Sequence, residues 1–292
     1  MRAAVLLVAL AAGGCGGSVT HHPDHDPPGA RARAIEPCAA TTRARDVRLR
    51  VLAGTPDMVV DVPAGLRAGH RVPLVLGLHG AGQDARGFEG ESNFTQVADE
   101  HRFLVVYPQS WRPRGFWKYP EADNPRSGLR LLRAAIAGAA RVACVDRGRV
   151  LVTGISSGGR MTYAAGCELA GRILAIAPVS GGTRRLPPCR QARPISVLDL
   201  HGTSDPIVSY RGVGPVMAGW ARRQGCRAAA RTRTVTRYVT RLDWPRCRGG
   251  VRVAHLRVQG GGHGWPPLGG PPGITLDGAE AIWRFFAALP SR

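Results

Sequence analysis

The chain has almost no lysine. Lys118 is the only one among 40 basic residues, so the other 39 are arginines (40 − 1), and 20 acidic residues leave a formal net charge of +20 at pH 7. A strongly basic chain is a candidate for binding nucleic acid, but this one contains neither a helix–turn–helix nor a basic stripe interleaved with aromatics. We therefore expect no nucleic-acid partner. The arginines are interpreted as solvated surface residues, with attraction to an anionic cell envelope or an acidic polymer as the second interpretation.

The start of the chain lacks an apolar run long enough to cross a bilayer. Residues 3–12 are apolar but too few to span one. With Arg2 before them and small residues after them, they predict an export signal over residues 1–14. Cys15 follows directly, as at a bacterial lipoprotein processing site, and is the candidate for lipidation. Ala12 stands where leucine is usual, so simple cleavage and release is the alternative.

The next segment lacks apolar periodicity. Residues 15–44 are rich in proline, glycine, aspartate and histidine, which predicts a disordered tether. Residues 45–292 are long enough for one large α/β domain, and they contain no internal repeat. We expect an exported, monomeric protein, extracellular or periplasmic, that meets a membrane only through a lipid anchor at Cys15.

Six cysteines remain once Cys15 is set aside. They are Cys38, Cys144, Cys167, Cys189, Cys226 and Cys247. In an exported chain an even number predicts three disulfides, which allow fifteen connectivities. Cys226 and Cys247 flank a local excursion and are paired first; Cys167 with Cys189 and Cys38 with Cys144 follow by elimination. None has the spacing of a zinc site, so we expect no metal.

From about residue 45 onward, apolar runs alternate with segments of helical periodicity. Strands are expected at 47–52, 58–62, 72–78, 103–107, 150–152, 173–179, 195–200, 234–242 and 251–258, and helices at 92–101, 129–142, 161–169, 213–224 and 276–289. This alternation predicts an α/β fold with a mostly parallel sheet and helices on both faces. The loop from 179 to 195 is too short for a helical lid, which favours an open, shallow site.

A Gly-x-Ser-x-Gly motif lies between an expected strand and an expected helix. It covers residues 154–158, with Ser156 in the middle. Strand, sharp turn and helix are the context of a nucleophile elbow, in which side chains at the flanking positions would clash, hence Gly154 and Gly158. The next backbone N–H, that of Ser157, then points to where an oxyanion would form.

A serine nucleophile needs a base and an acid to orient that base. Asp205 follows the strand at 195–200, and His263 follows the strand at 251–258 after three glycines that we interpret as a flexible approach. In this fold class the order along the chain is serine, acid, histidine. The sequence therefore predicts a triad of Ser156, Asp205 and His263.

The second oxyanion donor should come from the loop after the strand at 72–78. That loop begins with His79, and an amide near Gly80 or Ala81 is the candidate beside Ser157. His79 and His201 each end a strand before a glycine, which predicts that they line the mouth of the site. For His79 the alternative is a hydrogen-bonded residue that holds the loop.

Several aromatic side chains are candidates for binding a substrate. They are Trp111, Phe116, Trp117 and Tyr119 in one loop and Trp265 after the predicted catalytic histidine. Stacking on an aromatic acid or lying along a polyester chain would use them. The alternative is a loop anchored by buried tryptophans.

Five segments together resemble the polyhydroxybutyrate depolymerase/feruloyl esterase family of secreted α/β hydrolases. They are LHGAGQ, GISSGG, HGTSDPIVSY, GGGHGWP and AIWRFF, within residues 73–289. The resemblance implies an α/β-hydrolase fold and a serine esterase without a cofactor, with Ser156 as nucleophile, Asp205 as acid and His263 as base. Its substrates would be polyhydroxyalkanoate-type polyesters or feruloyl esters of polysaccharide. The alternative is a catalytically inactive, envelope-anchored binding protein on a hydrolase scaffold.

Overall fold

The computed structural model describes most of the expected folded domain. The described residues are 46–50, 57–67, 69–111, 115–118, 127–182, 189–227, 229–267 and 270–291. The predicted export signal and tether lie outside them, as do Cys15, Cys38 and Tyr119, so those predictions stay predictions. Within the described ranges, no helix combines the length and apolar character needed to cross a membrane.

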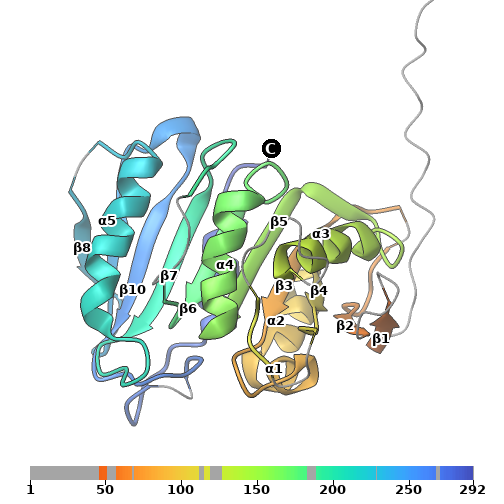
Figure 1. The fold of residues 1–292 in the computed structure, drawn as a ribbon, viewed down its shortest axis with the longest axis horizontal. Coiled ribbons are helices and arrows are strands. Elements are labelled where there is room, and N and C mark those ends of the chain that lie inside the picture. Colours follow the sequence, from red (N-terminus) through yellow and green to blue (C-terminus); the bar gives the residue numbers. More distant parts are fainter. Residues whose placement is uncertain are drawn as a thin grey trace, which may run out of the picture. The chain divides into compact units, whose positions relative to one another are not determined.

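A ten-stranded sheet runs through the described part of the chain in the order β1-β2-β4-β3-β5-β6-β7-β10-β9-β8 (Figure 1). The strands are β1 (Asp46–Leu49), β2 (Met58–Asp61), β3 (Val72–Leu78), β4 (Leu104–Tyr107), β5 (Val145–Ile155), β6 (Ala175–Val179), β7 (Ser196–Gly202), β8 (Arg231–Thr234), β9 (Val239–Trp244) and β10 (Val253–Val258). From β4 through β10 in this order, neighbouring strands are parallel, and the antiparallel pairs lie at the two edges. The predicted mostly parallel sheet is confirmed.

Helices cover both faces of the sheet. They are α1 (Ala85–Ser92), α2 (Phe94–His101), α3 (Gly128–Ala139), α4 (Ser157–Glu168), α5 (Val213–Arg223) and α6 (Gly278–Ala287), with short 3₁₀ turns at Tyr210–Gly212 and Arg248–Gly250. Residues of α3, α4 and α5 share one hydrophobic cluster with one side of the strands, and residues of α1, α2 and α6 share a second cluster with the other side. Figure 1 shows α4 and α5 lying across one face.

The apolar run of β3 is explained by burial on both faces. Leu74, Leu76 and Leu78 belong to the cluster under α3 and α4, whereas Val75 between them belongs to the opposite cluster. A strand with a hydrophobic layer on each side needs apolar residues throughout rather than at alternate positions.

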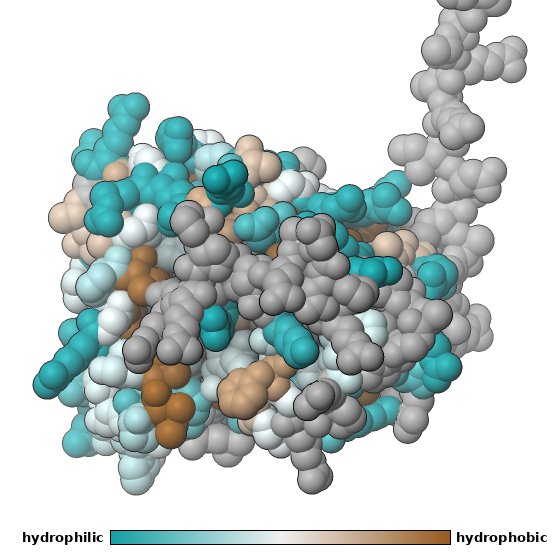
Figure 2. Space-filling view, viewed as in Figure 1, coloured by the Kyte–Doolittle hydropathy of each residue, from teal (hydrophilic) through white to brown (hydrophobic). Residues whose placement is uncertain are grey.

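On the surface, hydrophilic side chains are scattered across the face shown in Figure 2 rather than gathered in one block.

Two expected elements differ from the structure. The helix expected at 92–101 is preceded by α1, which the sequence left unassigned because Phe88 is its one large apolar residue. Asp84 caps α1 through a hydrogen bond from Gly87 N–H.

The strand expected at 234–242 is two strands, β8 and β9. The turn between them forms because Thr236 Oγ1 accepts hydrogen bonds from the backbone N–H groups of Tyr238 and Val239.

Two of the expected disulfides are formed. Cys167 in the last turn of α4 is bonded to Cys189, and Cys226 after α5 is bonded to Cys247. Cys144 also takes part in a disulfide, but Cys38 lies outside the described residues, so their pairing stays a prediction. Disulfides persist in oxidising compartments, so these bonds fit an exported protein.

Candidate active site

Ser156 occupies a sharp turn between β5 and α4. Its backbone has φ 55° and ψ −112°, in the half of conformational space that non-glycine residues rarely adopt. The turn is held by a hydrogen bond from Ser156 N–H to Val179 O (2.9 Å) and one from Arg160 N–H to Ser156 O (2.8 Å). A strained residue fixed in this way is typical of a functional position.

The glycines of the motif are required by close packing. A Cβ atom at Gly158 would lie 2.2 Å from Leu78 O, and one at Gly154 would lie 2.6 Å from the same oxygen. Both distances are far below van der Waals contact, so the elbow can sit against the end of β3 only without these side chains. Gly159 is equally constrained, since its Cβ would lie 2.6 Å from Val179 O. The sequence motif alone does not single out Gly159.

Asp205 and His263 are joined directly. His263 Nδ1 lies 2.8 Å from Asp205 Oδ2 in a hydrogen bond, while Asp205 Oδ1 accepts from the backbone N–H groups of Ile207 and Val208, each at 2.8 Å. Burial alone would raise the pKa of Asp205, but the hydrogen bonds from Val208, His263 and Ile207 outweigh it and hold this pKa below its ordinary value. Asp205 is therefore ionised and acts only as an acceptor.

The loops after β7 and β10 are joined by hydrogen bonds. Ser204 N–H donates to Gly261 O (2.8 Å), and Gly260 N–H donates to Thr203 Oγ1 (2.8 Å). A Cβ at Gly202 would lie 2.3 Å from Gly261 O. The glycines before His263 thus allow close packing of two loops, and the interpretation of a flexible approach is wrong.

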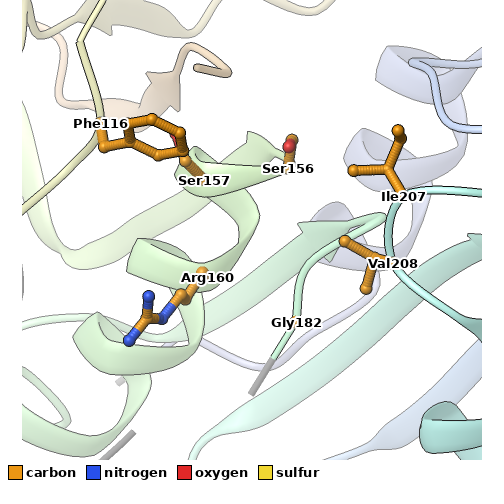
Figure 3. Close-up of a pocket in the computed structure, with 7 residues that line it drawn as sticks. All are labelled: Phe116, Ser156, Ser157, Arg160, Gly182, Ile207 and Val208. Atoms are coloured by element: carbon orange, nitrogen blue, oxygen red, sulfur yellow. The ribbon is translucent and has the colours of Figure 1, made fainter. Parts of the chain in front are cut away.

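Ser156 borders a cavity of about 400 Å³, which we call the Ser156 cavity. Its described lining consists of Phe116, Ser156, Ser157, Arg160, Gly182, Ile207 and Val208 (Figure 3). Ile207 and Val208 belong to the loop that carries Asp205, so the serine and the acid loop meet at one cavity. Within the described part of the chain, no hydrogen bond joins Ser156 to His263.

The structure distinguishes between the candidate oxyanion donors. Ser157 begins α4, where backbone N–H groups have no partner inside the helix. Gly80 N–H, by contrast, already donates to Gln83 Oε1 at 2.8 Å, so its assignment as an oxyanion donor is wrong. Ala81 N–H makes no hydrogen bond to a described residue and is the remaining candidate in this loop.

His79 holds its loop rather than lining the mouth. The side chain is fully buried, with Nδ1 2.8 Å from Gly80 O and Nε2 accepting from Ser110 N–H at 3.2 Å. Burial lowers the pKa of His79, against the smaller opposing effect of Gly80 O. A neutral, enclosed imidazole cannot bind substrate, so this prediction is wrong and the alternative holds.

His201 supports the acid. It is buried, and its Nε2 lies 2.8 Å from Val208 O and 3.2 Å from Asp205 Oδ2. Asp205 therefore has an imidazole on each side, that of His263 and that of His201. His201 also borders a second cavity, lined in addition by Tyr163.

Two of the three tryptophans predicted to bind substrate are buried in the protein interior. Trp265 is fully buried among the aromatics under α1 and α2, and its Nε1–H donates to Ser92 O at 3.1 Å, so its assignment to substrate binding is wrong. Trp117 is buried and donates to His79 O at 2.8 Å, as an anchored loop requires. Trp111 is half-buried beside Trp117 at a further cavity of about 300 Å³, which Phe116 also lines. Among the described aromatic residues, Phe116, 76% exposed, borders the Ser156 cavity.

Among the residues described, no group of three or more His, Cys, Asp or Glu side chains is arranged to hold a metal ion.

Curated proteins with similar sequences are named as esterases, whereas no protein-family model matches the chain. The bifunctional acetylxylan esterase/xylanase of Neocallimastix patriciarum is 29% identical over 196 residues, which cover 65% of this chain and 28% of that protein. Feruloyl esterase B of Piromyces equi is 28% identical over 232 residues, covering 70% and 42%. A probable feruloyl esterase C of Aspergillus flavus is 28% identical over 240 residues, covering 80% and 84%. This chain thus spans less than half of the first two relatives.

Solved structures give the same fold. An acetyl xylan esterase from Aspergillus awamori superposes with a TM-score of 0.64 at 18% identity, covering 79% of this chain and 93% of that one. A ferulic acid esterase from Anaeromyces mucronatus superposes with a TM-score of 0.51 at 14% identity, covering 87% and 95%. The parallel sheet, the elbow and the acid and histidine loops define an α/β-hydrolase fold. It is a homologue of the proteins named feruloyl esterase and acetylxylan esterase, and the resemblance to feruloyl esterases is confirmed.

Proposed function

We propose that this protein hydrolyses carboxylic esters by acyl transfer through Ser156, His263 and Asp205. The observation that supports this most is the hydrogen bond of 2.8 Å between His263 Nδ1 and Asp205 Oδ2, formed in loops at the carboxyl ends of β7 and β10. Ser156 stands at the carboxyl end of β5, in the same sheet. Residues at this edge of parallel strands are where α/β folds build their sites.

The reaction proceeds in two halves. Ser156 Oγ attacks the carbonyl carbon while its proton moves to His263 Nε2, and Asp205 keeps the Nδ1–H in place. The bond to the alcohol oxygen breaks as Nε2–H protonates that oxygen, leaving an acyl group on Ser156. Water then attacks the acyl carbon and gives a proton to Nε2, and the carboxylic acid leaves as Ser156 regains its proton.

The negative charge on the carbonyl oxygen is stabilised by the backbone N–H groups of Ser157 and Ala81. Ser157 is at the first position of α4, where the helix dipole adds to the effect. One such donor contributes about 10² to 10³ in kcat. Backbone donors fixed by the elbow and by the loop after β3 need no rearrangement during the reaction.

The substrates we propose are feruloyl or acetyl esters of polysaccharide, with polyhydroxyalkanoate-type polyester as the second choice. The names of the relatives favour the former. Phe116 and Ile207 are 76% and 70% exposed, and Figure 3 shows them on opposite sides of Ser156, where an acid with an aromatic ring would contact both. The protein takes part in envelope or extracellular chemistry as an exported, monomeric enzyme, with Cys15 as the candidate anchor.

Purified protein tests the reaction. Wild type should hydrolyse p-nitrophenyl butyrate, and Ser156→Ala should reduce kcat by about 10⁶. Equal rates in both would refute the assignment. Hydrolysis of methyl ferulate, acetylated xylan and polyhydroxybutyrate film, measured side by side, then ranks the substrates.

One observation favours an inactive binding protein as the second candidate function, namely that Ser156 and His263 share no hydrogen bond within the described residues. In enzymes without substrate such bonds are often long and tighten on binding. A fluorophosphonate probe separates the two functions, since only an activated serine reacts. Labelling of wild type and not of Ser156→Ala supports the hydrolase, and no labelling of either supports the binding protein.

A further inference from the structure

A second cavity lies beside the Ser156 cavity, with a volume of about 710 Å³ against about 400 Å³. We call it the α5 cavity. Its described walls come from α4, the segment after β6, the loop after β7 and the start of α5. Its lining includes Tyr163, Gly182, His201, Val208, Val213 and Val216. A volume of this size is in the range of cavities that enclose a drug-sized molecule, far more than an acetyl group fills.

The two cavities share a border. Gly182, Ile207 and Val208 line both of them. In Figure 3, Ile207 and Val208 stand next to Ser156, and Gly182 lies beneath them. Gly182 adds no side chain to this shared border. A chain attached to Ser156 that runs along Ile207 and Val208 would reach the α5 cavity.

The described lining of the α5 cavity combines aliphatic side chains with the polar side chains of Tyr163, His201, Ser209 and Arg211. Val208, Val213 and Val216 supply aliphatic walls. The Tyr163 hydroxyl donates to Asp199 at 2.6 Å, and His201 Nε2 contacts Val208 O at 2.8 Å, so these polar atoms are engaged inside the protein. Burial, followed by the negative charge of Asp199, raises the pKa of Tyr163, which keeps its hydroxyl neutral. An aliphatic ligand gains from burying apolar surface here, and the Tyr163 hydroxyl and His201 Nε2 keep their partners. His201 Nδ1 is buried without a hydrogen-bond partner among the described residues.

Geometry at the carbonyl carbon decides which part of an ester enters. Its oxygen faces the N–H groups of Ser157 and Ala81, and its alcohol oxygen must face His263, which protonates it. Ser157 lines the Ser156 cavity but not the α5 cavity, and Ala81 and His263 line neither. The remaining substituent is the acyl group, and it is the one directed toward these cavities.

We propose that the α5 cavity is the subsite for an aliphatic acyl chain much longer than acetyl. This rests on the proposed ester hydrolysis, and among the substrates proposed above it favours the polyester, whose acyl part is an aliphatic chain, over acetyl and feruloyl esters. Val208 and Ile207 contact the carbons next to the carbonyl, and Val213 and Val216 contact the distal end of the chain.

Filling the cavity tests the proposal. Val216 is half-buried and lines the α5 cavity but not the Ser156 cavity, so Val216→Trp should obstruct its distal end. The matched control is Arg222→Trp, an exposed position on the same helix. The measurement is kcat/KM for p-nitrophenyl acetate, butyrate, hexanoate and octanoate. Thermal unfolding and fluorophosphonate labelling report whether each variant is folded.

We expect the wild type to prefer octanoate to acetate. Val216→Trp should lower the octanoate-to-acetate ratio of kcat/KM by about tenfold or more, as loss of several methylene contacts requires, and Arg222→Trp should leave the ratio unchanged. If Val216→Trp does not fold, Val216→Phe replaces it with the same expectation.

The outcomes separate the two proposals. If wild type hydrolyses acetate and the ratio is unchanged in the folded Val216 variant, the subsite is refuted and the ester hydrolase stands. If the variant loses activity on octyl acetate but keeps it on methyl octanoate, the cavity holds the alcohol and the acyl assignment is overturned. If wild type hydrolyses no ester, the proposed function itself fails.

Discussion

Strands β7 and β10 carry two Asp–His pairs. Asp199 and His255 are register partners inside the sheet, with His255 Nδ1 2.7 Å from Asp199 Oδ2. Asp205 and His263 lie in the loops beyond the same two strands, with the corresponding atoms 2.8 Å apart. The two pairs have almost the same distance and the same ring nitrogen, but their surroundings differ.

The pair inside the sheet is enclosed by protein. Asp199 Oδ1 accepts from the Tyr163 hydroxyl at 2.6 Å, and His255 Nε2 lies 3.1 Å from the Tyr210 hydroxyl. The side chains of Asp199 and His255 are at most 3% exposed, whereas that of His263 is 17% exposed. An Asp–His pair therefore does not by itself make an active site. Only the pair beyond the strand ends has its histidine open to a substrate, so we expect activity to depend on one pair and stability on the other.

The histidines should show the largest difference. His263→Ala removes the proposed base and should reduce kcat for p-nitrophenyl butyrate by about 10⁶. His255→Gln should leave kcat within about threefold of wild type while lowering the melting temperature. Steady-state kinetics and thermal unfolding of both variants are the measurements. Comparable losses of kcat in the two variants would contradict the distinction.

The aspartates should show the same division with a smaller effect on rate. Asp205→Asn should lower kcat by about 10⁴, because the amide favours the wrong tautomer of His263. Asp199→Asn leaves a buried imidazole without its carboxylate and should lower the free energy of unfolding by about 3 kcal/mol. Urea unfolding and kcat measured on both proteins test this. A stable Asp199→Asn protein would show that the contact between Asp199 and His255 contributes little.

The sequence could predict the pair of Asp205 and His263, because the end of an apolar run marks the end of a strand and therefore the start of a loop. Asp205 and His263 each follow such a run, and Ser156 lies in a motif with constrained glycines. Asp199, by contrast, is a polar residue inside an apolar run, and its partner His255 is revealed only by strand register.

Other residues could not be assigned because packing decided their roles. Trp265 follows the predicted base by two positions, yet it turns into the core under α1. Gly80 lies in the expected oxyanion loop, but Gln83 occupies its N–H group. Proximity in sequence to a catalytic residue is thus a poor guide to contact with substrate, since a shift of one or two residues moves a side chain from the cavity to the interior.

His201 lies between Asp199 and Asp205 in the sequence. It is a positioning residue, since its Nε2 lies 3.2 Å from Asp205 Oδ2 and it touches no reacting atom in the proposed mechanism. His201→Phe removes both the contact with Asp205 and the hydrogen bond to Val208 O in the acid loop, and should lower kcat by about 10- to 100-fold. KM for acetate esters should change little. His201→Gln, which retains a donor, should recover most of kcat, whereas equal losses in both variants would indicate a merely structural role.

The smallest expected effect is on acid stability. Because the native pKa of Asp205 lies below its ordinary value, its carboxylate contributes stability that is fully present above the unfolded pKa of about 4 and is lost as the pH falls through the native pKa. Asp205→Asn should therefore flatten the dependence of the melting temperature on pH between about pH 2 and pH 5. The hydrogen bonds from Ile207 and Val208 that hold the carboxylate also fix the wall shared by the two cavities. If the wild-type and variant curves stay parallel, these contacts do not favour the ionised form, and the difference between the two Asp–His pairs reduces to the exposure of their histidines.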